Sequence, residues 1–153
     1  MIKKEDRKMK TNNITLINMY FTLMNCSTYK LPQKIGYAIM KNLKILQPEV
    51  DIYNESYAKL EDKYMDKIQK DKDNQIKRSE NGSPIFVTTK DAEVFLKEYS
   101  ELADIEIEVD LYQIDEELFN YDDSNGRYDT LAPKDIMTLQ TILCKQSEEK
   151  EEK

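Results

Sequence analysis

Apolar residues recur along the middle of the chain at alternating intervals of four and three positions. The series consists of Ile39, Leu43, Leu46, Val50, Tyr53, Tyr57, Leu60 and Tyr64. Residues at this spacing lie on one side of an α-helix, so the pattern predicts a long amphipathic helix from Pro32 to about Lys70. We expect this side of the helix to face the core.

The two halves of the predicted long helix differ in how much of their surface is apolar. In the first half, Ala38, Ile45 and Ile52 widen the stripe, which is typical of a helix buried by several neighbours. In the second half the stripe is narrow and consists mostly of tyrosine. Pro48 lies opposite the stripe, where a proline removes one backbone hydrogen bond and bends the helix. Because the spacing continues in register through Pro48, we expect a kink, with a break at Gln47 as the alternative.

Shorter helices are predicted on either side of the long one. The first follows an N-cap at Thr11 or Asn12 and ends near residue 25. Its apolar residues surround most of its circumference, so we expect it to be buried between neighbours. A second helix follows a cap at Thr88 or Thr89, and a third begins at Pro133, a residue favoured in the first helical turn.

The remaining pattern predicts a small amount of β-structure. Ile105, Ile107, Val109 and Leu111 alternate with polar residues, which is the period of a half-buried strand. Residues 84–88 predict a short strand that pairs with residues 75–79 across an Asn-Gly turn, and residues 115–120 predict a helical turn. The predicted fold class is therefore α+β and predominantly α, with a long kinked central helix packed with shorter helices and a small antiparallel β element.

Length and charge predict how the chain is divided. With 153 residues, we expect a single globular domain, which we assign to residues 12–144. Residues 1–11 are predicted to be a flexible arm and residues 145–153 a disordered, charged tail. Cys26 and Cys144 are expected to be reduced, because no export signal precedes them.

Composition excludes several classes of function. The chain has no histidine, which removes imidazole bases and histidine ligands for zinc. Its three glycines lie far apart and form no phosphate-binding loop. The net charge of −7 argues against direct binding of nucleic acid, and no apolar run approaches the roughly 20 residues of a membrane span. We expect a cytoplasmic protein without a cofactor.

Carboxylates are the remaining candidates for chemistry. Glu106, Glu108 and Asp110 share one face of the predicted strand, at intervals of about 7 Å. Carboxylates so placed could hold Mg²⁺ or contact a basic partner, and the alternative is a solvated strand face. The same face has the sign of a DNA mimic, but basic and acidic residues are interspersed along the chain, which argues against a long acidic surface.

A loop near the C-terminus contains part of a calcium-binding pattern. Asp123, Asn125 and Asp129 have some of its spacing, but Tyr121 stands where the first ligand belongs. This departure favours an Asx-rich turn that holds no metal ion.

Several short segments form a further pattern along the chain. They are Lys30–Pro32, Tyr37–Ile39, Lys41–Asn42, Tyr64, Asp71–Asn74, Phe95, Glu98–Leu102 and Ile105–Leu111. These segments resemble a family of small phage and prophage proteins of low-GC Gram-positive bacteria, in which a long helix is followed by a polar turn, a short strand, a helix and an acidic strand. The polar turn of this chain lacks the Asp-x-x-Gly motif that is usual in the family. The resemblance implies a phage-type origin and a non-enzymatic role.

The predicted function is that of a non-enzymatic phage or prophage accessory protein that binds another protein. Its sharpest form is an inhibitor of a host defence system, such as a CRISPR effector nuclease. The alternatives are a virion or tail assembly component and, least favoured, a carboxylate-metal enzyme. The partner is expected to be a host protein, with a second copy of the chain as the alternative.

The tyrosine-rich half of the long helix is the predicted partner-binding surface. Tyr53, Tyr57 and Tyr64 are expected to contact the partner together with the polar segment 71–83, because that segment has few apolar residues with which to cover them. The acidic strand face defined above is the second candidate surface. The alternative for the tyrosines is burial beneath the next helix and the 105–111 strand.

Overall fold

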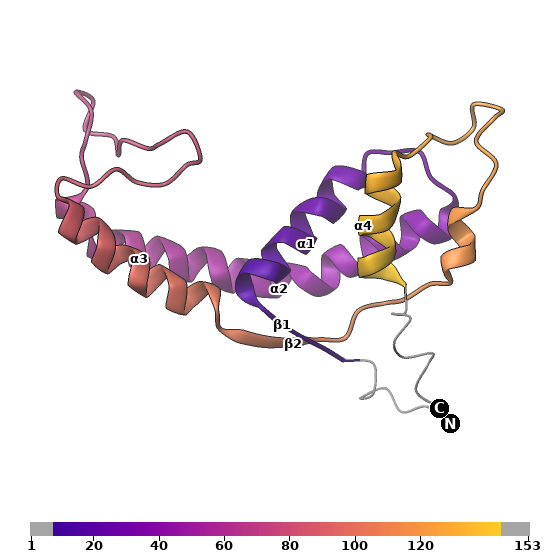
Figure 1. Ribbon diagram of the computed structural model, residues 1–153, viewed down its shortest axis with the longest axis horizontal. Helices are drawn as coiled ribbons and strands as arrows, with labels where there is room; N and C mark the ends of the chain where they lie inside the picture. The colour runs from indigo at the N-terminus through magenta and orange to yellow at the C-terminus, as the bar shows by residue number, and fades with distance from the viewer. Residues whose placement is uncertain (1–7, 145–153) are drawn as a thin grey trace. The chain divides into compact units, whose positions relative to one another are not determined.

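The computed structural model describes residues 8–144 (Figure 1). These residues form four α-helices and one two-stranded antiparallel sheet, which confirms the predicted fold class. They divide into two compact units, where we predicted one domain over residues 12–144. The first unit contains the residues up to Val50 and those from Glu106 onward, and the second unit is Asp51–Ile105.

The long helix α2 covers Gln33–Lys63, and Pro48 lies inside it. The prediction that the helix continues through Pro48 is confirmed, but the predicted end at Lys70 is wrong. After Lys63 the backbone tightens into the 3₁₀ turn η2, Met65–Lys67, and Ile68 is buried. The helix ends early because this apolar side chain reaches the core only when the chain leaves the helical path.

Most of the predicted stripe on α2 faces a core. Its buried members are Ile39, Leu43, Leu46, Val50, Leu60 and Tyr64, and the remaining two tyrosines are half-buried. The predicted wide apolar face does not extend to Ile52, which is 58% exposed. Ile52 belongs to the second unit, whose other elements cover α2 only along the side that bears the tyrosines.

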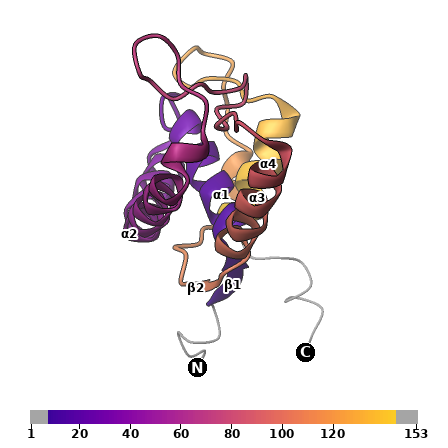
Figure 2. The same cartoon turned by 90° about the vertical axis from the view of Figure 1, so that its left-hand side faces the viewer.

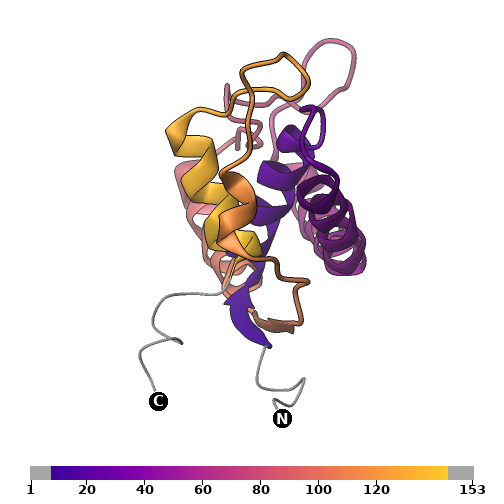
Figure 3. The ribbon, with the colours of Figure 1, turned by 90° about the vertical axis from the view of Figure 1, so that its right-hand side faces the viewer.

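Helix α1, Asn13–Cys26, begins where the sequence predicts, because the Asn12 side chain accepts a hydrogen bond from the Thr15 backbone N–H at 2.9 Å. The expectation that α1 is buried on most sides is wrong, since Phe21 is 57% exposed. Its buried face packs beside α4, Pro133–Leu143, as Figure 3 shows. Only one side of α1 is covered, which leaves the rest of its apolar surface in solvent.

The sheet of the first unit pairs β1, Met9–Asn12, with β2, Glu106–Val109 (Figure 3). The prediction of a strand at β2 is confirmed. The prediction of a flexible arm over residues 1–11 is wrong where it includes β1, which shows no alternating apolar pattern and is ordered by pairing with a distant segment. The remainder of that arm and the predicted tail, residues 145–153, lie outside the described residues.

Two polar contacts hold distant segments of the first unit together. The side chain of the buried Asn42 donates to the Tyr112 carbonyl at 2.8 Å and accepts from the Tyr112 N–H at 2.7 Å. The Lys30 N–H donates to the Asp129 carboxylate at 2.7 Å, and the Asp129 N–H donates to the Lys30 carbonyl at 2.8 Å. These bonds attach the long C-terminal loops to α2 and to its N-terminal connector.

Cys26 and Cys144 are both buried and are not joined by a disulfide. Burial raises the pKa of the Cys26 thiol, with a smaller contribution from the charge of Asp135. Within residues 8–144, none of the helices has both the length and the apolar character that crossing a bilayer requires.

Candidate functional site

Two helical segments form the walls of the second unit. One is residues 51–63 of α2, and the other is α3, Thr89–Ala103, which begins after the predicted Thr88 cap. Aromatic rings from the two helices meet edge to face, with the centroid of Tyr57 6.3 Å from that of Phe95 and 5.9 Å from that of Tyr99. The unit seen in Figure 2 is therefore held by aromatic packing between its two helices.

The chain between η2 and α3 forms three short segments that pair with one another in a ring. The Gln69 N–H donates to the Ile85 carbonyl at 2.7 Å, the Ile85 N–H to the Lys77 carbonyl at 3.0 Å, and the Lys77 N–H to the Gln69 carbonyl at 2.9 Å. The predicted pairing of residues 75–79 with residues 84–88 is confirmed at the bridge between Arg78 and Pro84, although it consists of isolated bridges.

This folded segment covers the end of the tyrosine stripe, contrary to our expectation. Ile68 belongs to a buried cluster with Leu60, Tyr64 and Phe95, and Ile76 and Phe86 pack against this cluster. The three covering residues are too far apart in sequence to show a local pattern, and only the ring of backbone bonds brings them to one side. Because most residues of the segment are polar, the sequence did not predict that its few apolar side chains would cover the tyrosine stripe.

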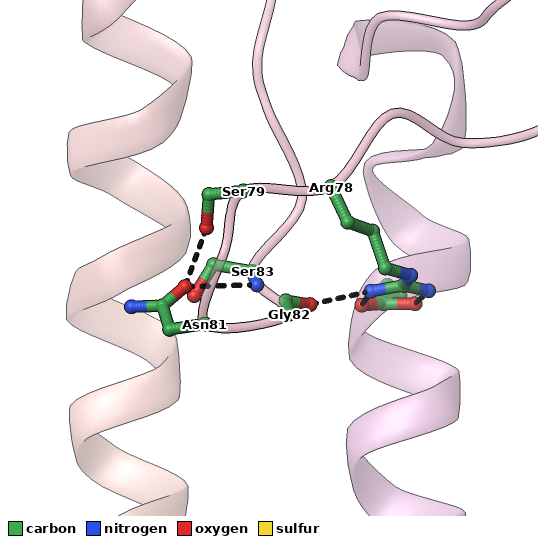
Figure 4. Close-up of polar contacts among 6 residues, drawn as sticks. Arg78, Ser79, Asn81, Gly82 and Ser83 are labelled. Atoms are coloured by element: carbon green, nitrogen blue, oxygen red, sulfur yellow. Dashed lines mark hydrogen bonds and ion pairs between the residues drawn. The ribbon is translucent and has the colours of Figure 1, made fainter.

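A partly buried ion pair between Arg78 and Glu61 attaches the folded segment to α2 (Figure 4). Arg78 donates from Nη1 to Glu61 Oε2 at 2.8 Å and from Nη2 to Glu61 Oε1 at 3.0 Å, and Nη1 also donates to the Gly82 carbonyl at 3.0 Å. These bonds lower the pKa of the Glu61 carboxyl, and the Tyr57 hydroxyl also bonds this carboxylate. Arg78 thus connects α2 to the Asn-Gly turn that follows Arg78 in the sequence.

The turn itself is the predicted Asn-Gly turn. Asn81 Oδ1 accepts from the Ser83 N–H at 3.2 Å and from the Ser79 hydroxyl, as Figure 4 shows. Gly82 has a φ of 90°, in the left-handed region that favours glycine. The turn is fixed by its own hydrogen bonds, so residues 81–83 present a defined polar edge.

This polar edge closes one side of a cavity of about 440 Å³. The cavity is lined by Tyr53, Tyr57, Asn81, Gly82, Ser83, Pro84, Phe86, Ala92, Phe95, Leu96 and Tyr99. None of the lining residues carries a charge at neutral pH, although 35% of the chain is charged. We refer to this cavity as the tyrosine pocket.

The hydroxyl groups of Tyr53 and Tyr57 in the tyrosine pocket remain neutral at physiological pH. Burial raises the pKa of Tyr53, whose hydroxyl lies 3.0 Å from that of Tyr99, and burial followed by the bond to Glu61 raises the pKa of Tyr57 to about 12. Neutral hydroxyls both donate and accept hydrogen bonds, so the pocket combines apolar walls with polar groups that orient a ligand.

The structure separates the residues that we predicted to contact a partner. Tyr53 and Tyr57 line the tyrosine pocket, which supports their place at a binding surface. Tyr64 does not line it, because it is buried in the cluster with Phe95, and its hydroxyl donates to the Glu98 carboxylate. We therefore reassign Tyr64 to the core.

The acidic strand residues belong to the first unit, where Glu106, Glu108 and Asp110 are exposed. The sequence offered α3 and the 105–111 strand as the elements that cover the tyrosines. Helix α3 does cover them. In the strand, only Ile105 belongs to the second unit, and the other residues belong to the first unit. Sequence reasoning missed Leu96 and Tyr99 as members of the pocket. The sequence placed both residues in the apolar stripe of α3, but that stripe predicted only that they face the core and did not predict a pocket.

Acidic groups do not gather into a metal site within residues 8–144, where no three Asp, Glu, Cys or His side chains are suitably arranged. In the loop with a partial calcium pattern, Asn125 Oδ1 accepts from the Arg127 N–H at 3.0 Å. The Asp129 carboxylate is bonded to the Lys30 backbone. This loop is the Asx-rich turn that the sequence favoured.

Comparison with other proteins leaves the tyrosine pocket as the main basis for assigning a function. No protein-family model matches the chain, and no curated protein or solved structure is significantly similar to it.

Proposed function

We propose that this protein is a non-enzymatic binding protein, and that the tyrosine pocket receives an uncharged side chain of a protein partner. The observation that carries this proposal is the uncharged, aromatic lining of a pocket in a strongly charged chain. Tyrosine is enriched at the energetic centres of protein interfaces, because its ring buries a large area and its hydroxyl finds a polar partner.

The packing around the pocket supports this role. Tyr57 is held by edge-to-face contacts with two rings of α3, and the turn at residues 81–83 is held by Arg78 and its own hydrogen bonds. A rigid pocket binds more tightly than a mobile one, because little conformational entropy is lost on binding. Leu96 lines the pocket and is 58% exposed, so a partner would gain by covering it.

The resemblance to phage proteins supplies the biological setting of the proposal. Within that setting, we propose an accessory protein that acts in the bacterial cytoplasm by inhibiting a host defence protein, such as a CRISPR effector nuclease. A virion or tail assembly component is the second candidate, since it uses the same kind of surface. A carboxylate-metal enzyme ranks last, because no carboxylate lines the pocket.

The test compares two substitutions on α3. Leu96→Asp places a charge at the wall of the pocket, whereas Val94→Asp places the same charge on the same helix at a residue that does not line it. Both side chains are substantially exposed, at 58% and 44%, so both variants should fold. Each variant is immobilised beside the native protein and used to capture partners from a lysate of the infected host.

The expected result is that Leu96→Asp loses a protein that the native chain and Val94→Asp both retain. The identity of that protein separates the two candidate functions, since a host nuclease supports inhibition and a capsid or tail protein supports assembly. Equal capture by all three proteins, with melting curves unchanged, would place the binding surface outside the pocket.

A further inference from the structure

A second surface emerges from the distribution of charge. From Lys8 to Pro48 the chain contains six lysines and neither Asp nor Glu, although the whole chain has 30 acidic residues. Our expectation that the charges are interspersed is wrong for this stretch. The net charge of −7 is therefore the sum of a basic stretch and a strongly acidic remainder. The net charge of the whole chain does not predict the charge of the surface that this stretch forms.

The basic residues gather on the outward side of the first part of α2. Lys34, Tyr37, Met40, Lys41 and Lys44 are all exposed. At about 100° per residue they lie within roughly one third of the helix circumference. The opposite side is buried in the first unit. We refer to these five residues as the lysine face.

The lysine face ends before the boundary between the units. Glu49 is the first carboxylate of α2 and belongs to the first unit, whose part of α2 ends at Val50. The part of α2 that lacks carboxylates is therefore residues 33–48.

An aromatic pair lies on the lysine face. The rings of Tyr37 and Tyr112 meet edge to face with centroids 5.5 Å apart, and Lys41 Nζ lies 6.0 Å and 5.9 Å from the two centroids. The two hydrogen bonds between the Asn42 side chain and the Tyr112 backbone hold Tyr112 against α2. Both rings remain accessible, with Tyr37 55% and Tyr112 39% exposed.

Carboxylates approach the lysine face along one edge. Asp115 and Glu117 line a shallow cavity together with Lys34 and Tyr112. Lys41 and Lys44 are not among the residues that line this cavity. Lys41 and Lys44 are therefore the lysines of the face that do not share this cavity with the two carboxylates.

We propose that the lysine face binds single-stranded nucleic acid. Proteins that bind single strands combine cationic side chains for the phosphates with exposed aromatic rings on which bases stack, and this face provides both. Only unpaired bases offer their faces to an aromatic ring, which favours a single strand over a duplex. An acidic protein would satisfy the lysines but would leave the exposed aromatic pair without a role.

The proposal predicts a defined dependence on salt. For single strands, log K falls with log salt concentration by about 0.7 per phosphate contact, so three lysine contacts give a slope of about −2. The measurement is the fluorescence anisotropy of a labelled oligothymidine of about 20 nucleotides, titrated with the full chain at several salt concentrations. Lys41→Ala combined with Lys44→Ala should reduce the slope to about −0.7 and weaken binding at low salt.

The aromatic pair predicts a different effect. Tyr37→Leu keeps a large apolar side chain but removes the ring, so it should weaken binding roughly tenfold and leave the salt slope unchanged. The matched control is Lys59→Ala combined with Lys97→Ala, which changes the net charge equally within the second unit. Since Lys59 and Lys97 lie outside the lysine face, this control should bind as the native protein does.

Several outcomes would overturn the proposal. Equal weakening by both pairs of lysine substitutions would show attraction to net charge without a defined site. Displacement of the oligonucleotide by polyglutamate at the same charge concentration would assign the face to an acidic protein. Failure of the native chain to bind at low salt, or native-like binding by Tyr37→Leu, would also exclude it. Thermal melting curves establish that each variant is folded, as the exposure of these side chains predicts.

Discussion

The ion pair between Arg78 and Glu61 gives the most direct test of how the second unit is assembled. Arg78→Met removes the guanidinium but keeps most of the aliphatic side chain. Glu61 is only 7% exposed, so its carboxylate then loses two charged donors in a place that water reaches poorly. The bond from Arg78 to the Gly82 carbonyl is lost as well.

The size of the effect follows from the burial of the two partners. Breaking a fully buried ion pair costs roughly 3–5 kcal/mol, whereas an exposed pair contributes roughly 0–1 kcal/mol. The Arg78 side chain is 43% exposed, so water can approach the guanidinium side of the pair. We therefore expect Arg78→Met to lower the free energy of unfolding of the second unit by about 2 kcal/mol.

Hydrogen exchange measures this loss in the unit concerned. The backbone amides of Gln69, Lys77 and Ile85 form the ring of bonds in the folded segment, so their exchange reports its opening. A loss of about 2 kcal/mol should accelerate their exchange roughly 30-fold. Lys63→Met is the control, because it breaks the more exposed pair with Glu98 and should change exchange little.

A double-mutant cycle separates the loss of the pair from other effects. Glu61→Gln leaves an uncharged acceptor for the Tyr57 hydroxyl, so adding it to Arg78→Met should recover part of the stability by removing the unpaired charge. Exchange at the three amides that stays within threefold of native in Arg78→Met would refute the reasoning. Such a result would mean that packing alone holds the segment on α2.

Four other perturbations test the structure. Leu46→Asp should unfold the first unit, because it places an unpaired charge at a fully buried position, and circular dichroism melting checks it. At high pH, the free energy of unfolding should fall as the pH rises above the ordinary tyrosine pKa of 10.0. The folded state raises the pKa of Tyr57 to about 12, so the unfolded chain releases this proton first. Urea unfolding at several pH values measures the effect. The folded state lowers the pKa of Glu61, so the stability that its ion pair provides is present above the ordinary pKa of 4.5 and is lost as the pH falls below it. In Arg78→Met, which lacks the ion pair, this pH-dependent loss of stability should be absent. Addition of Mg²⁺, Ca²⁺ or EDTA should leave the melting temperature unchanged, and a rise with metal would point to the acidic strand residues.

The helices could be predicted because their signals are local. The Asn12 and Thr88 caps, the proline at the start of α4 and the regular stripe on α2 each act within a few residues of the element that they define. Such signals depend on the sequence alone, since backbone hydrogen bonds in a helix join residues four apart. The early end of α2 was missed because it depends on where Ile68 becomes buried, which is a tertiary property.

The missed elements depend on contacts between distant residues. Strand β1 has no apolar alternation of its own and pairs with β2 almost one hundred residues later. The ring of bonds in the folded segment was predicted only where residues 75–79 pair with residues 84–88, and the bonds that add Gln69 to the ring were missed. Neither could be inferred from a single segment, because a strand pairing is a property of two segments and of the chain that brings them together.

The candidate site shows the same division. The tyrosine stripe marked Tyr53 and Tyr57 as unusual, since their part of α2 has too narrow an apolar face for a central helix. The stripe could not distinguish them from Tyr64, because all three occupy equivalent positions in the apolar spacing of the sequence. That distinction arises from α3 and the folded segment, which bury Tyr64 but leave an uncharged pocket beside the other two.

The boundary after Val50 divides α2 in chemistry as well as in packing. Before it, the inward residues are mostly aliphatic and the exposed charged residues are mostly lysines. After it, the inward residues are mostly tyrosines and the exposed charged residues include Asp51 and Glu55. Two surfaces of different chemistry on separate units should bind their ligands independently, since each depends on its own packing. Leu96→Asp should therefore leave oligonucleotide binding unchanged, and the Lys41 and Lys44 substitutions should leave capture of the protein partner unchanged. If one substitution abolishes both activities, the two surfaces serve a single ligand, and the separate assignments must be merged.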